Sequence, residues 1–158
     1  MSIIDFYTWV EHSSLGNWMR YYTYAFSAIE VVHLFGVTVL LGTIYTVNFR
    51  LCGFALKSRS VSEIARGMAP WSLGGYVVTF ITGVMLFASE ALKMHDNGLW
   101  PYKTTFLFAA LILQFTVYRS ITKPGRAEAS PLIAKFTGAV SAVLWLFVGM
   151  AARGIAFI

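Results

Sequence analysis

The sequence is poor in charged residues. Only 12% of its 158 residues are Asp, Glu, Lys or Arg, whereas a soluble globular domain carries about 25%. Its single cysteine, Cys52, excludes an intramolecular disulfide. We find no phosphate-binding loop, no soluble catalytic triad and no internal repeat in it. The shortage of charge, together with 58% hydrophobic residues and a mean hydropathy of +0.67, predicts an integral membrane protein of one domain.

Four apolar segments approach or exceed the roughly 20 residues that a membrane-spanning helix needs. They cover residues 22–47, 69–92, 104–118 and 132–158. The third is short, and we expect Trp100, Pro101 and Tyr102 to begin it, because aromatic side chains favour the headgroup level and proline suits the first turn of a helix. The sequence therefore predicts an all-α integral membrane four-helix bundle over residues 21–158.

The basic residues predict how this bundle is oriented. The segments 50–66 and 119–135 hold eight of the 12 basic residues, and the opposite side holds Arg20, Lys93, Lys103 and Arg153. Basic loops of membrane proteins face the cytoplasm. We therefore expect both termini on the outer side of the membrane, which the family resemblance described below implies is the periplasmic side of a bacterial inner (cytoplasmic) membrane. Because the basic residues flank apolar runs, the net charge of +5 does not indicate nucleic-acid binding.

Residues 1–20 have a different pattern. Ile3, Phe6, Tyr7 and Val10 recur at helical spacing, with polar residues between them. The segment lacks the basic start, the uninterrupted apolar core and the small-residue cleavage site of a signal peptide. We expect a short amphipathic helix, which either lies on the outer membrane surface or docks a partner.

Two ionisable residues lie inside the first apolar segment. Glu30 and His33 are three positions apart, so they share one face of the predicted helix. Counted from residue 22, they lie roughly 12 and 16 Å inside the membrane. A charged side chain at such a depth costs about 2.5–3.5 kcal/mol on insertion scales and usually marks a function. The simpler alternative is a Glu–His hydrogen bond that only neutralises two polar groups in the core.

His33 is a candidate ligand of haem b, whose iron binds histidines of helical bundles. A second axial ligand has to come from a facing helix at a similar depth. Met85, roughly 12 Å from the outer end of the second segment, meets this condition better than His95, which lies about 16 Å above His33. Ligation by His33 alone is an equal alternative. The residues that would suit the haem propionates at the outer surface are Trp100, Lys103 and Arg153.

Other uses of the same residues stay open. Glu30, His33 and Glu90 could hold a single copper, zinc or iron ion, or could relay protons to a quinone or a partner. A di-iron site is not predicted, because it needs the Glu-x-x-His pair twice and this chain has it once. The polar residues could also serve only packing and docking in a non-catalytic anchor or assembly subunit. A transporter is disfavoured, because we find neither an inverted repeat nor interrupted helices.

Several stretches resemble known families. Residues 30–55, EVVHLFGVTVLLGTIYTVNFRLCGFA, residues 69–91, APWSLGGYVVTFITGVMLFASEA, and the later WPYK are similar to small bacterial four-helix inner-membrane proteins of unknown function. That family usually carries an aspartate before LRLLG, and Asn48 stands near this place here. More distantly, the order His33, Gly42, Arg50, Trp100, Lys103 resembles the membrane haem-b protoporphyrinogen oxidases and the copper-resistance D proteins. This second resemblance implies roles for His33 and Lys103.

The favoured function is a haem b-binding membrane redox subunit. We expect it to transfer electrons between a donor on the periplasmic side and quinone or a partner protein. It would contact the lipid bilayer and work as a homo-oligomer or as one subunit of a membrane complex. The expected cofactor-binding residues, with His33 as the metal ligand, are Glu30, His33, Met85, Glu90, Trp100, Lys103 and Arg153.

Overall fold

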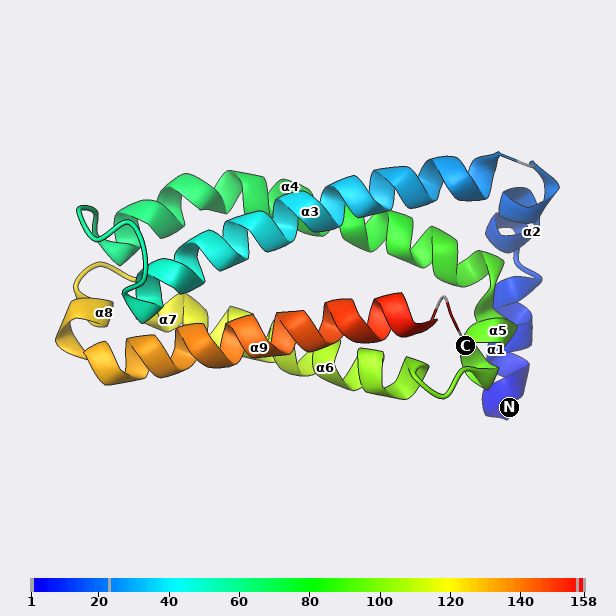
Figure 1. Cartoon of the computed structure of the whole chain (residues 1–158). Helices are drawn as coiled ribbons and strands as arrows, with labels where there is room; N and C mark the ends of the chain where they lie inside the picture. Colours follow the sequence, from blue (N-terminus) through cyan, green and yellow to red (C-terminus); the bar gives the residue numbers. More distant parts are fainter. Residues whose placement is uncertain (1, 23, 156, 158) are drawn as a thin grey trace.

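Four long helices form a bundle, and three short helices lie across one of its ends (Figure 1). The computed structural model describes residues 2–22, 24–155 and 157. The long helices are α3 (Ala25–Cys52), α4 (Val61–Ser89), α6 (Trp100–Leu113) and α9 (Pro131–Ile155), and α6 continues through the π-helical η1 (Gln114–Tyr118) into α7 (Arg119–Ile121). All four spans are long and apolar enough to cross a membrane. The chain is therefore a multi-pass membrane protein, as the composition predicted.

The helices begin at local signals, such as a capping serine or a first-turn proline, and not at the ends of the apolar runs. α6 begins at Trp100 with proline in its first turn, as expected. α4 begins at Val61, earlier than its apolar run, because the Ser60 hydroxyl accepts a hydrogen bond from the backbone N–H of Glu63 at 3.2 Å. α3 begins only at Ala25. His33 therefore lies about 12 Å from the start of its helix, and Glu30 about 8 Å, which is less deep than the sequence indicated.

The bundle consists of two helix pairs. α3 packs most extensively against α4, α6 packs against α9, and contacts between α3 and α9 join the pairs. Glycine makes the α3–α4 contact close, because a Cβ added to Gly75 would lie 2.9 Å from the backbone nitrogen of Leu40. A Cβ added to Gly36 would lie 2.8 Å from Cγ1 of Val78. The two helices thus approach until backbone meets backbone, as small residues allow in membranes.

The three short helices close what we call the cap end of the bundle. They are α1 (Ile3–Glu11), α2 (Ser14–Tyr21) and α5 (Ala91–Asp96). The Arg20 guanidinium donates a hydrogen bond to the carbonyl oxygen of Ser89 at 3.1 Å and lies 3.7 Å from the Glu11 carboxylate. That carboxylate accepts a hydrogen bond from the Leu92 N–H at 2.7 Å. Glu11 and Arg20 therefore hold α1 and α2 against the ends of α4 and α5.

The N-terminal segment contains two helices where one was expected. α1 ends at Glu11, and the Ser13 hydroxyl caps α2 by accepting a hydrogen bond from the Gly16 N–H at 3.2 Å. That these helices lie on a membrane surface stays a prediction. The two basic segments lie together at the opposite end, which we call the loop end (Figure 1). It contains residues 53–60, residues 122–125 and α8 (Arg126–Ala129).

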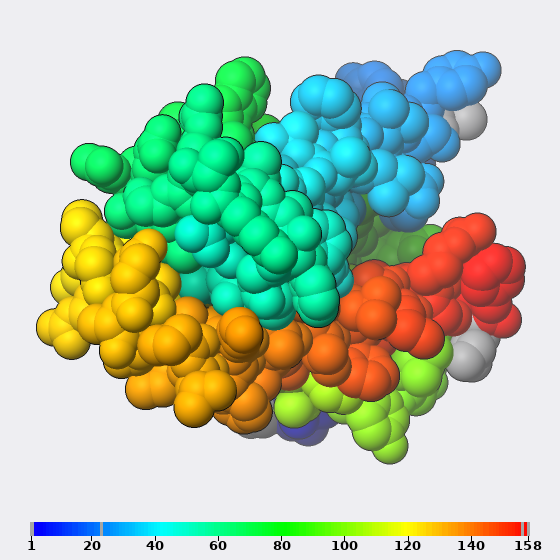
Figure 2. Space-filling model, turned by 60° about the vertical axis from the view of Figure 1, so that its left-hand side comes forward, coloured from blue at the N-terminus to red at the C-terminus, as the bar shows by residue number. Residues whose placement is uncertain are grey.

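The buried core is concentrated towards the loop end. One cluster there includes Val47, Leu51, Tyr118 and Ile121, and a second near mid-bundle contains Leu40, Ile44, Ala110 and Trp145. Towards the cap end, by contrast, the described segments 25–35 and 100–109 contain no fully buried residue. Figure 2 shows the blue end of α3 standing apart from the red end of α9. The cap ends of α3 and α6 therefore lack fully buried residues, whereas Thr82, Ala88 and Ala91 are buried at the same end of the bundle.

Candidate functional site

The His33 imidazole lies against α4 in the cap half of the bundle. Its Nδ1 is 2.8 Å from Oγ1 of Thr82. The next residue of α4 is Gly83, where an added Cβ would lie 3.2 Å from Cε1 of His33. The ring is half-buried. α4 thus provides a hydroxyl partner for one ring nitrogen and a side-chain-free surface for the ring itself.

The hydrogen bonds of Thr82 favour one tautomer of the neutral ring. The Thr82 hydroxyl has one hydrogen, and its shortest acceptor is the Val78 carbonyl oxygen, 2.6 Å away. With its hydrogen on that carbonyl, the same oxygen is placed to accept a hydrogen bond from Nδ1–H of His33. In the neutral ring this places the proton on Nδ1 and leaves a lone pair on Nε2. A histidine that ligates a metal has this arrangement, with a second group orienting the ring.

Lys103 lies close enough to His33 for their charges to interact. Its Nζ also lies 5.0 Å from the ring centre of Trp100, one turn earlier on α6, which is a cation–π distance. Trp100 is held firmly in place, because its ring stacks on Phe87 at 5.2 Å and its indole N–H donates to the Tyr7 hydroxyl at 3.1 Å. α6 therefore brings a half-buried amine, supported by an aromatic ring, towards the His33 side of the bundle.

The other predicted site residues are less close to the imidazole. Glu30 is exposed, although its charge is near enough to interact with His33. Glu90 lies where α4 meets α5 and its carboxylate is 3.5 Å from Nζ of Lys93. Arg153 is exposed, with its guanidinium 4.6 Å from the ring centre of Phe157. Within residues 2–22, 24–155 and 157, no three His, Cys, Asp or Glu residues form a metal-binding group, so the structure does not assemble Glu30, His33 and Glu90 into one.

The register of α3 on α4 places Met85 one turn away from the His33 level. His33 lies beside Thr82, and the helices run antiparallel, so Met85 lies about 4.5 Å nearer the cap end. α3 and α4 are also in contact at this depth, as Gly83 shows. A flat macrocycle therefore does not fit between them at this level. This arrangement favours ligation by His33 without Met85.

Sequence reasoning did not find Thr82 or Gly83 as partners of His33. Threonine and glycine are common in membrane helices and indicate no ligand by themselves. Only the register between the two helices places this hydroxyl on Nδ1. The spacing of Thr79, Thr82 and Gly83 along one helical face is compatible with several registers, so the sequence contains no decisive signal for this pair.

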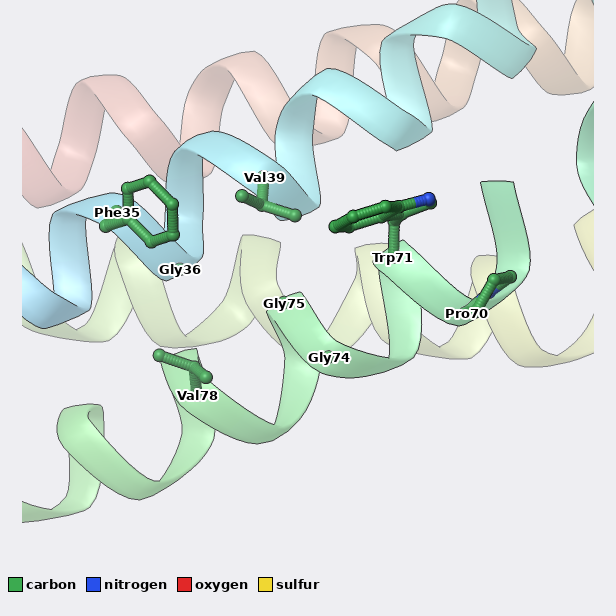
Figure 3. Close-up of a pocket in the computed structure, with 8 residues that line it drawn as sticks. All are labelled: Phe35, Gly36, Val39, Pro70, Trp71, Gly74, Gly75 and Val78. Carbon is green, nitrogen blue, oxygen red and sulfur yellow. The ribbon is translucent and has the colours of Figure 1, made fainter. Parts of the chain in front are cut away.

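A groove of about 460 Å³ lies on the outer face of the α3–α4 pair, beyond His33 towards the loop end (Figure 3). Phe35 and Val39 stand on its α3 side and Trp71 on its α4 side. Its lining is Phe35, Gly36, Val39, Pro70, Trp71, Gly74, Gly75 and Val78. These side chains offer no metal ligand and no acid or base. In a bilayer the groove suits a lipid chain, and it is separate from the polar site around His33.

Comparison with known proteins assigns no chemistry to this arrangement. A family model described as "Family of unknown function (DUF6644)" matches residues 6–158, almost the whole chain. No curated protein and no solved structure matches the chain. What the site does must therefore be argued from its own residues.

Proposed function

The chain belongs to this family of unknown function, and we propose from its residues that it is a haem b-binding redox subunit of the bacterial inner membrane. The subunit passes electrons between a donor on the periplasmic side and quinone or a partner protein. The observation that supports this most directly is the hydrogen bond from Nδ1 of His33 to Thr82, which leaves Nε2 free as a ligand. Haem b would supply a one-electron redox couple, and the chain would hold and orient it.

The packing at the cap end is compatible with such a group. Protein interiors are normally close-packed, yet the described segments 25–35 and 100–109 contain no fully buried residue. A flat apolar macrocycle bound on the inner side of α3 would bury side chains of these two segments. His33 would bind its metal, and Thr82 would keep the imidazole in the ligating tautomer.

Lys103 supports an anionic ligand in the same place. An ammonium group inside a membrane bundle is normally paired with an anion. Among the described residues, no carboxylate forms a salt bridge with Lys103. A haem propionate would provide the missing negative charge, and the Trp100 ring would support the lysine from its other side. Arg153, exposed near the end of α9, is a second candidate for this role.

The basic segments support the proposed orientation. Eight of the 12 basic residues belong to the segments that the structure gathers near the loop end. The positive-inside rule places this end in the cytoplasm. His33 and Lys103 would then lie in the half of the membrane nearer the periplasm, where a periplasmic donor could reach the cofactor.

An absorption spectrum of the protein purified from haem-sufficient cells tests the proposal. We expect a Soret band that is lost in His33→Ala and kept in His95→Ala, a control in the cap. Thr82→Val should weaken haem affinity about 10- to 100-fold, as loss of an orienting partner does. Met85→Leu should leave the band unchanged if His33 is the sole axial ligand.

Two outcomes would contradict the proposal. One is a folded protein that is colourless after such purification, and the other is a Soret band that survives His33→Ala. A colourless protein with no bound metal would favour a non-catalytic anchor or assembly subunit. One bound metal ion per chain without porphyrin would favour a mononuclear metal site at His33.

A further inference from the structure

A second polar cluster lies deep in the bundle, on the loop-end side of the His33 site. Asn48 of α3 is 0% exposed and Trp145 of α9 is 4% exposed. Tyr76 of α4 and Gln114 of η1 are half-buried, but their polar atoms are shielded from solvent. Among the residues that the structure describes, Asn48 Oδ1, Tyr76 OH, Gln114 Oε1 and Trp145 Nε1 have no hydrogen-bond partner.

These side chains come from all four long spans, on the loop-end side of His33. The ring centres of Tyr76 and Trp145 are 6.3 Å apart, and the Tyr76 ring is 5.7 Å from Phe115, the neighbour of Gln114. Nδ2 of Asn48 donates a hydrogen bond to the Ser141 hydroxyl at 3.1 Å, one turn before Trp145 on α9.

The helix directions bear on where the polar tips lie. Helical side chains lean towards the N-terminus of their own helix. α3 and α6 run from the cap end to the loop end, and α4 and α9 run the opposite way (Figure 1). Asn48 and Gln114 therefore lean towards the cap end, while Tyr76 and Trp145 lean towards the loop end. This lean shortens the distance along the bundle between the two pairs of polar groups.

Leaving such groups unpaired is unfavourable. A buried donor or acceptor without a partner loses its hydration without compensation, and this penalty is higher inside a membrane, where no bulk water reaches it. Four such atoms together would remove a large part of the small net stability of a folded protein. Apolar residues would serve packing equally well at these positions. A partner for these groups is therefore the better explanation.

The donor and acceptor types limit what that partner is. The Trp145 indole only donates, the two amide oxygens only accept, and the Tyr76 hydroxyl does both. A metal cation would satisfy the oxygens but would repel the indole N–H. An anion would satisfy the indole but would repel the amide oxygens. Water both donates and accepts, and polar sites with several such partners hold it inside proteins.

A backbone irregularity occurs at the same place. The third span changes from α- to π-helical geometry over Gln114–Tyr118, although this segment contains neither proline nor glycine. π-turns are rare and often mark functional sites. The wide turn begins at Gln114, whose side chain neighbours Tyr118. The local backbone is therefore distorted where the polar cluster forms.

We propose that Asn48, Tyr76, Gln114 and Trp145 bind a small cluster of water molecules inside the bundle. The site does not depend on the haem proposal, because it uses none of the residues around His33. It is nevertheless connected to them along α4. Tyr76 is followed at helical spacing by Thr79, whose hydroxyl is also buried without a described partner, and then by Thr82, which holds His33.

The experiment is water-edited NMR on the full chain in lipid nanodiscs, with the tryptophan indole nitrogens labelled with ¹⁵N. Trp145→Phe identifies the Trp145 signal among the five tryptophans. We expect magnetisation to pass quickly from water to the Trp145 N–H despite its burial. Trp71, which is 65% exposed on the apolar face of α4, is the matched dry control and should receive little.

Variants connect the signal to the cluster. Gln114→Leu and Tyr76→Phe each remove a polar partner with little change in volume, and each should reduce water transfer to Trp145 several-fold. The measurement on the unmodified chain stands alone if a variant does not fold. Transfer to Trp145 no faster than to Trp71 would overturn the proposal. So would a Trp145 signal that responds to an added short-chain quinone but not to water, which would assign the site to a quinone headgroup.

Discussion

Gly75→Ala is the most direct test of the helix contact that positions the His33 site. A Cβ at residue 75 would lie 2.9 Å from the backbone nitrogen of Leu40 and 3.0 Å from its Cα. Backbone atoms cannot rotate away as a side chain does. Ordinary contacts begin at 3.4 Å, so α3 and α4 would have to separate by about 0.5 Å at this point. A gap of this size loses a quarter to a half of the dispersion energy of each affected contact.

The adjacent glycine is a matched control. A Cβ added to Gly74 meets nothing within 4 Å. Both substitutions gain the same helix propensity, roughly 0.5–1 kcal/mol, so this gain cancels when the two variants are compared. The remaining difference is the cost of overpacking, typically about 1–3 kcal/mol. We therefore expect Gly75→Ala to be less stable than Gly74→Ala by about this amount.

Reversible unfolding in mixed detergent micelles measures the free energy of unfolding of both variants. The same preparations report the His33 site, because a displaced α4 moves Thr82 away from Nδ1. If haem binds as proposed, Gly75→Ala should also bind it more weakly, while Gly74→Ala should match the unmodified chain. Equal stability of the two variants would refute the close α3–α4 contact.

The remaining predictions concern the cap. Arg20→Met removes the hydrogen bond to Ser89 and the ion pair with Glu11. We therefore expect faster amide hydrogen exchange in α1 and α2, which corresponds to a loss of about 1–3 kcal/mol in the free energy of local opening, and unchanged exchange in the four spans. Equally faster exchange throughout the chain would contradict this local role of Arg20. The Ser2 backbone N–H donates a hydrogen bond to the Asp5 carboxylate, and this bond first, then the neighbouring Ser2 hydroxyl, lowers the pKa of that carboxyl. Because the folded pKa lies below the unfolded one, the stability that Asp5 gives α1 is complete above the ordinary Asp pKa and is lost as pH falls through the lowered value. NMR shifts of α1 amides against pH should show this loss, and Asp5→Asn should abolish it.

Local sequence patterns were sufficient to predict the four apolar spans and the start of α6. Trp100 and Pro101 begin α6 as expected, because interfacial aromatics and a first-turn proline act through their own residues and immediate neighbours. The start of α4 at Val61 was missed, since a serine cap extends this helix beyond its apolar run. The break between α1 and α2 was missed for the same reason, because the Ser13 cap is a local signal that the apolar spacing of residues 3–10 hides.

The candidate site was predictable only in part. The pair Glu30 and His33 stood out in the sequence, because an ionisable side chain inside a membrane helix is unfavourable whichever helices it packs against. The depth estimate that supported Met85 did not determine which residues of α4 face His33. That depends on where Gly36 and Gly75 let the backbones meet, which is a property of two helices together. The haem, the quinone and the orientation in the membrane stay predictions.

The sequence by itself determined that the chain has four segments apolar enough to cross a membrane as helices, because a lipid-exposed segment must satisfy its backbone hydrogen bonds within one helix. It also determined which segments carry the positive charge, because the positions of Lys and Arg are read directly from the order of the residues. The tertiary structure decided which polar groups meet. The pairings of His33 with Thr82 and of Asn48 with Ser141 join residues far apart in the chain. Contacts between helices depend on how far each helix is shifted along its neighbour and rotated about its own axis. The packing of side chains sets both within the folded bundle.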